Sequence, residues 1–132
     1  DDDTLAAWMS GTIGSAGIDA HVEIVDNRAT GGQRVSRITI VSDYNIADSE
    51  LLLKLFVLEV GNALRTIRAF SEGTMNADLD AAFLTVTDKN GQLLGTVSAT
   101  MPDIVRFLDG RSSVDEALAT LELTGVFETF RK

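Results

Sequence analysis

The sequence contains no cysteine, a single proline and a single histidine. Without cysteine, the chain has no disulfide framework, no thiolate zinc site and no cysteine nucleophile. One histidine, His21, leaves few groups for acid–base catalysis or for binding a transition metal. We therefore expect no catalytic residues, no metal site and no cofactor.

Basic residues are also scarce, because 11 lysines and arginines stand against 20 aspartates and glutamates, for a net charge of -9. They form no run, whereas nucleic-acid binding needs a concentrated basic face. An anionic membrane surface is disfavoured for the same reason. The composition predicts that nucleic acid is not a partner.

Long hydrophobic runs are missing even from the most apolar segment, Glu50–Phe70. Its longest uninterrupted apolar run is Leu55–Leu58, and Lys54, Arg65 and Arg68 contribute to a charged stripe along it. A transmembrane helix needs about 20 mostly apolar residues without such a stripe. We predict no membrane insertion by this segment.

The chain begins with Asp1-Asp2-Asp3, with no methionine, basic segment or apolar segment before them. Such a start follows removal of a signal peptide, and a cloning boundary produces it as well. Of these, we expect a mature exported or membrane-tethered domain in an extracytoplasmic location.

Alternating apolar residues predict two β-hairpins, at about 18–42 and 80–99. In the first, pairing Val22 with Ile38 places apolar side chains together, and the same register pairs Glu23 with Arg37. In the second, Asn90-Gly91 predicts a type I′ turn, because both residues tolerate positive φ. This turn places Leu84 opposite Val97.

Helical spacing predicts an N-terminal helix at 3–14, a long central helix at about 49–70 and short C-terminal helices. The expected order is α-β-β-α-β-β-α-α. Two hairpins separated by a long helix indicate an α+β fold, with an antiparallel sheet packed on the central helix. The length and the 45% hydrophobic content fit a single domain over 1–132.

The central helix carries more apolar residues than one face can hold. At 100° per residue, one broad apolar face predicts the core contact, formed by Leu52, Leu53, Phe56, Val57, Val60, Ala63, Leu64, Ile67 and Phe70. Leu51, Leu55 and Leu58 fall on a different side and form the candidate interaction surface. An internal neighbouring helix, a partner chain or an apolar ligand could cover them.

Two acidic groups invite a metal interpretation. Asp19, His21 and Glu23 alternate on one strand, but the outer two lie about 13–14 Å apart, too far for one ion to reach all three easily. Asp78 and Asp80 lack the spacing of a calcium loop. Both groups are more typical of solvated surface acids.

The C-terminal third carries Thr96-Val97-Ser98-Ala99, Asp103-Ile104, Gly110-Arg111, Glu116-Ala117 and Leu121-Glu122-Leu123-Thr124-Gly125. This pattern is similar to the C-terminal part of sterol carrier domains. The resemblance implies a strand, two helices and a last strand that help to close an apolar lipid tunnel. The long central helix has no place in that fold.

Together these patterns favour a non-catalytic binding or protein–protein interaction module that contacts a protein partner or a second copy of itself. The alternative is a carrier of an apolar small molecule or lipid. An enzyme with carboxylates gathered from distant segments is the third hypothesis.

Overall fold

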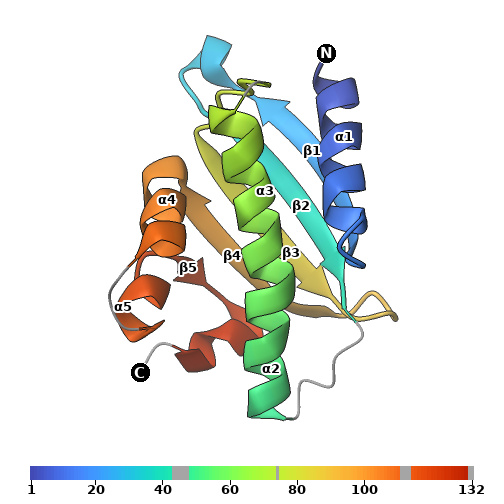
Figure 1. Cartoon of the computed structure of the whole chain (residues 1–132), viewed down its shortest axis with the longest axis vertical. Helices are drawn as coiled ribbons and strands as arrows, with labels where there is room; N and C mark the ends of the chain where they lie inside the picture. Colours follow the sequence, from blue (N-terminus) through green and yellow to red (C-terminus); the bar gives the residue numbers. More distant parts are fainter. Residues whose placement is uncertain (43–47, 74, 111–113, 131–132) are drawn as a thin grey trace.

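Five strands form one sheet in the computed structural model, which describes residues 1–42, 48–73, 75–110 and 114–130. The strand order follows the chain, β1-β2-β3-β4-β5 (Figure 1). The strands are β1 (Asp19–Asp26), β2 (Arg34–Val41), β3 (Ala81–Thr87), β4 (Leu93–Thr100) and β5 (Glu122–Leu123). The predicted α+β class and order of elements are confirmed, and β5 is added.

The predicted hairpin registers are confirmed. Val22 pairs with Ile38 and Glu23 with Arg37 in the first hairpin, and Leu84 pairs with Val97 in the second. Because side chains alternate across a strand, a slip by one residue would move each apolar set to the wrong face. The hydrophobic pattern therefore excludes a one-residue slip in the first hairpin, whereas the pairing of the second hairpin shifts by one residue between Val86 and Thr87.

The sheet is mixed, which corrects the prediction of an antiparallel sheet. β2 and β3 pair in parallel, with Ile38 beside Leu84. The helical connection between these strands returns the chain to the end of the sheet at which β2 began, so β3 runs in the same direction. The two hairpins are therefore joined side by side through a helical crossover.

The helices cover one face of the sheet. Figure 1 shows α1, α3 and α4 on the same side of the strands. Ile38 and Ile40 on that side are buried, whereas Arg37 and Thr39 on the opposite side are exposed. The helices are α1 (Asp2–Gly14), α2 (Ser49–Leu55), α3 (Gly61–Glu72), α4 (Met101–Asp109) and α5 (Val114–Leu118).

The turn of the second hairpin differs from the predicted type I′ turn. The Gly91 N–H donates to the Asp88 carbonyl at 3.0 Å, and the Asp88 N–H donates to the Gln92 carbonyl at 2.9 Å. Gly91 has φ of +82°, but Asn90 does not have positive φ. The loop therefore holds three residues between Asp88 and Gln92, in the pattern of a type I turn followed by a left-handed glycine.

The C-terminal segment closes the core beside the long helix. Phe56 meets Phe107, Phe127 and Phe130 edge-on, with ring centroids 6.2, 5.4 and 5.3 Å apart. Gly125 begins the last helical turn with φ of +64°, and a side chain there would collide with the backbone of β4. In the described part of the chain, none of the helices combines the length and apolar character that a membrane span needs.

Candidate interaction surface

The long central helix consists of α2, a π-helical turn at Phe56–Val60 and α3. Asp48 caps its start, because one carboxylate oxygen accepts the N–H groups of Glu50 and Leu51 at 2.9 and 3.4 Å. At the far end, the Gly73 N–H donates to the Ala69 carbonyl at 2.9 Å. The helix thus has the predicted start and length, with an interruption that the sequence did not predict.

The π turn rotates the first half of the helix by one residue relative to the second. A π turn accommodates an extra residue, so the buried face before it moves back by one position. The predicted face contained Leu52, Leu53, Phe56 and Val57, whereas the protein buries Leu52 and Phe56 together with Leu55. After the turn, Ala63, Leu64 and Ile67 are buried as predicted.

This rotation separates the three leucines of the predicted interaction surface. Leu58 is 54% exposed, Leu51 is partly buried and Leu55 is completely buried. The internal-neighbour interpretation therefore applies to Leu55, which belongs to the core and cannot reach a partner. Only Leu58 remains fully on the surface.

Three apolar side chains of the first half face solvent, and we call Leu53, Val57 and Leu58 the helix stripe. Their exposed fractions are 41%, 55% and 54%. The other large apolar side chains with comparable exposure lie far from them in the sequence, at Trp8, Met75 and Leu93. The helix stripe is thus the densest exposed apolar sequence segment in the described chain.

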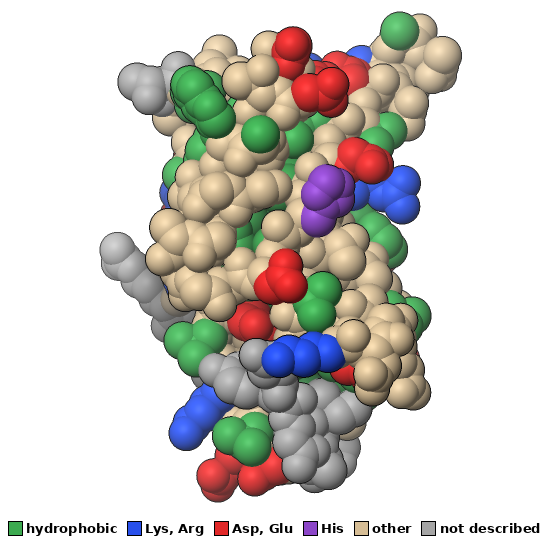
Figure 2. Space-filling view, turned by 90° about the vertical axis from the view of Figure 1, so that its right-hand side faces the viewer, with side chains coloured by type: hydrophobic (Ala, Val, Ile, Leu, Met, Phe, Trp, Pro, Cys, Tyr) green, Lys and Arg blue, Asp and Glu red, His purple; other side chains and the backbone are tan. Residues whose placement is uncertain are grey.

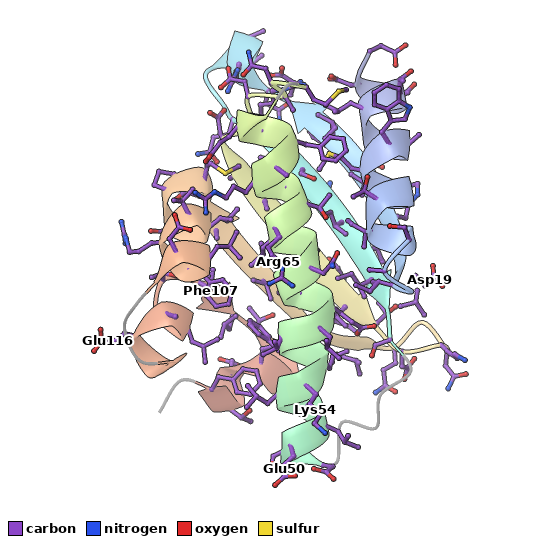
Figure 3. All side chains as sticks on the ribbon, in the orientation of Figure 1. Asp19, Glu50, Lys54, Arg65, Phe107 and Glu116 are labelled. Atoms are coloured by element: carbon purple, nitrogen blue, oxygen red, sulfur yellow. The ribbon has the colours of Figure 1, made fainter. Side chains whose placement is uncertain are left out.

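Charged residues lie along the same outer side of the helix. Glu50, Lys54 and Arg65 are exposed, with Glu50 near the start of the helix and Arg65 beyond the π turn (Figure 3). Within the described chain, none of the three makes an ion pair. Arg68, by contrast, bonds to Asp109 at 2.6 Å.

A shallow groove joins the helix stripe to the end of α1. Leu58 lines it together with Ala16, Ile18, Asn62 and Arg65, and its volume is about 220 Å³. The groove combines apolar side chains with the Glu59 carboxylate, the Asn62 amide and the Arg65 guanidinium. Such a combination is typical of a protein contact with an apolar centre and a polar rim.

The two edges of the sheet are partly covered. At β1, the Ser10 hydroxyl of α1 accepts the Val22 N–H at 3.0 Å, and a groove of about 510 Å³ runs beside it on the side shown in Figure 2. At the other edge, β5 is only two residues long, and just beyond it the Thr124 N–H donates to the Thr96 carbonyl of β4 at 3.0 Å. Covered edges disfavour the addition of a strand from a partner. The helix stripe is therefore a stronger candidate for a binding surface than either edge of the sheet.

The acids considered as metal ligands have other roles. Asp19, His21 and Glu23 are exposed on the open face of the sheet, where His21 pairs with Thr39 across the strands. Among the described residues, no three histidine, aspartate or glutamate side chains form a group that could hold a metal. These three side chains therefore lie on the solvent-facing side of the sheet.

Asp78 and Asp80 are held by arginines of the first hairpin. Arg28 donates to Asp78 at 3.0 Å and to Asp80 at 2.8 Å, and the Arg34 N–H donates to Asp80 at 2.8 Å. The hydrogen bonds from Arg28, followed by the one from the Arg34 backbone, lower the pKa of Asp80 to about 2. These carboxylates tie the loop before β3 to the first hairpin, which leaves them poorly suited to acid–base catalysis.

Aromatic side chains pack between the central helix and the C-terminal segment. The chain does have the strand, two helices and short strand that the resemblance to sterol carrier domains implies. However, Phe56 and Phe127 fill the region between the central helix and this segment, and both are at most 1% exposed. The largest groove described, about 610 Å³ between α3 and α4, is crossed by the ion pair of Arg68 with Asp109.

No protein family model, no curated protein and no solved structure gives a significant match to this chain.

Proposed function

We propose that this protein is a non-catalytic interaction module whose contact surface is the helix stripe. The observation that carries the proposal is that Leu53, Val57 and Leu58 are 41 to 55% exposed within one stretch of helix. Clustered apolar exposure of this kind marks binding surfaces, whereas single exposed residues need no explanation.

The fold itself does not need these three side chains. α2 already buries Leu52 and Leu55, and Phe56 follows them into the core. Burial of each such side chain contributes about 1.5–3 kcal/mol, and the exposed residues contribute much less. A partner that covers the helix stripe would recover this apolar burial, which supports a binding role for it.

Photocrosslinking tests the proposal without assuming the identity of the partner. A photoreactive amino acid at position 57 of the full-length chain is expected to form a covalent adduct with a protein in the source cells. The same amino acid at Ala119, an exposed position outside the helix stripe, serves as the matched control. Mass spectrometry of the adduct identifies the protein that covers position 57, including a second copy of this chain.

The adduct at position 57 should disappear when Leu53 and Leu58 are both replaced by serine. These substitutions remove apolar surface without entering the core, so the variant should keep its unfolding midpoint. Absence of any adduct at position 57, or equal adducts at positions 57 and 119, contradicts an interaction role for this surface.

A further inference from the structure

The outer side of the central helix has a symmetric arrangement of charge. The negative residue Glu50 lies seven positions before Val57, and the positive residue Arg65 lies seven positions after Leu58. At about 1.5 Å per residue, each charge is roughly 10 Å from the centre of the helix stripe. Apart from Lys54, which lies between Leu53 and Val57, the order along the helix is therefore acidic, apolar and basic.

The π turn is what brings these residues into line. Residues before the turn are rotated by one position, which places Glu50, Leu53 and Val57 on the same exposed side as Arg65. In an uninterrupted α-helix, Leu53 and Val57 would instead face the core. Glu50, the helix stripe and Arg65 therefore follow one another along one side of the folded helix. A regular helical wheel does not show this arrangement.

We infer that the helix stripe pairs with the helix stripe of a second copy of this chain, antiparallel about a two-fold axis beside Val57 and Leu58. This inference rests on the proposed function and names the partner. Each Glu50 then lies opposite Arg65 of the partner subunit.

The charges favour this partner over others. A two-fold contact uses the same patch on both copies, so every complementary pair forms twice. Parallel pairing would instead place Glu50 against Glu50 of the partner subunit and Arg65 against the partner's Arg65. A basic protein, which the net charge of -9 would attract at long range, would meet Lys54 and Arg65 on this surface.

The position of α2 leaves this approach open. α1 and α4 pack against α3, whereas α2 extends past the end of α1 in Figure 1. Arg65 is exposed and has no ion pair within the described chain, unlike Arg68. The contact is small because it consists of one helix from each copy, so we expect a weak and concentration-dependent dimer.

Charge reversal across the two-fold axis tests the inference by sedimentation velocity from micromolar to millimolar concentration. The unmodified chain is expected to pass from monomer to dimer. Glu50→Arg and Arg65→Glu should each raise the dimer Kd by about tenfold or more, because each substitution creates two like-charge contacts. An equimolar mixture of the two variants should restore the Kd, because both contacts are then complementary.

Circular dichroism of each variant separates loss of pairing from loss of folding, and Glu50→Gln with Arg65→Gln gives a milder pair if charge reversal unfolds the chain. A monomer at every concentration overturns the inference, and so does a dimer that the mixture fails to restore. In either case, an adduct between position 57 and a different protein would leave the proposed interaction function in place.

Discussion

The two halves of the central helix differ in sequence and in surroundings. α3 packs against α1 and α4, and Arg68 ties it to α4 through Asp109. α2 buries one side in the core, and the helix stripe faces solvent on the other. The charges of α2, on Glu50 and Lys54, make no ion pair in the described chain.

This difference shows that apolar content and burial are separate properties of a helix. The first half has apolar residues on two sides, and the π turn decides which side enters the core. The side that enters contains Leu52, Leu55 and Phe56, which leaves Leu53 and Val57 outside. The exposure of these apolar side chains is a structural property of the fold. The function we propose is that they contact a binding partner.

The largest expected effect comes from changing the length of the π turn. Inserting one alanine after Leu58 rotates α2 by a further residue and removes Leu52, Leu55 and Phe56 from the core. At about 1.5–3 kcal/mol each, this loss approaches the whole stability of a typical domain. We expect this variant to lose cooperative unfolding in urea, followed by circular dichroism.

Deleting Leu58 is the matched control, because it removes the extra residue. The helix can then run as a continuous α-helix with both buried faces unchanged. This variant should unfold cooperatively. Equal damage from the insertion and the deletion would show that the π turn does not set the rotation of α2.

A smaller effect is expected from single leucine truncations on the two sides of α2. Leu55→Ala should lower the free energy of unfolding by about 2–5 kcal/mol, because Leu55 is completely buried. Leu58→Ala should change it by less than about 0.5 kcal/mol, because Leu58 is on the surface. Urea unfolding of both variants gives the comparison, and similar losses would contradict the assigned rotation.

The cap of α2 should contribute less again. Asp48→Ala removes the acceptor of the Glu50 and Leu51 N–H groups and should cost about 1 kcal/mol of unfolding free energy. Ser49→Ala, one residue later, is the control and should have little effect. If Ser49→Ala lowered the unfolding free energy more than Asp48→Ala, Asp48 would not be the residue that caps the helix.

The smallest expected effect concerns the ion pairs beyond α3. The pKa of Asp80 is lowered to about 2 by Arg28, so the folded state binds fewer protons than the unfolded state in acid. Its contribution to stability is complete above about pH 4 and is lost as the pH falls toward 2. Asp80→Asn should reduce the dependence of the unfolding free energy on pH between about pH 4 and pH 2. An unchanged dependence on pH would contradict the pairing of Asp80 with Arg28.

Much of the fold could be predicted from the sequence where the signals are local. Alternation excludes a one-residue slip in the pairing of Val22 with Ile38, and the position of the Asn90-Gly91 turn predicts the pairing of Leu84 with Val97. The parallel pairing of β2 with β3 could not be predicted, because neither hairpin specifies how it meets the other. The extra residue in the Asn90-Gly91 loop was missed because the dipeptide fits two turn types.

The exposed apolar side chains lie in the half of the helix that the sequence singled out, but of the three predicted residues only Leu58 is among them. A wheel with constant rotation predicts Leu53 and Val57 in the core and places Leu55 outside it. Either rotation of α2 buries large apolar side chains, so the pattern alone does not decide between them. The regular wheel left a second apolar side at Leu51, Leu55 and Leu58. This second side was the signal that either of two faces in the first half of the helix could enter the core.

Thiol labelling tests the central claim most directly, because the chain contains no cysteine of its own. Leu55→Cys and Val57→Cys introduce single thiols on opposite sides of the first half of the central helix, and the labelling rate of each is measured in the native protein across a dilution series. We predict slow labelling at position 55 throughout, and fast labelling at position 57 that slows as the concentration rises. Fast labelling at position 55, or protection of position 57 in dilute solution, would contradict the claim that the π turn exposes the helix stripe.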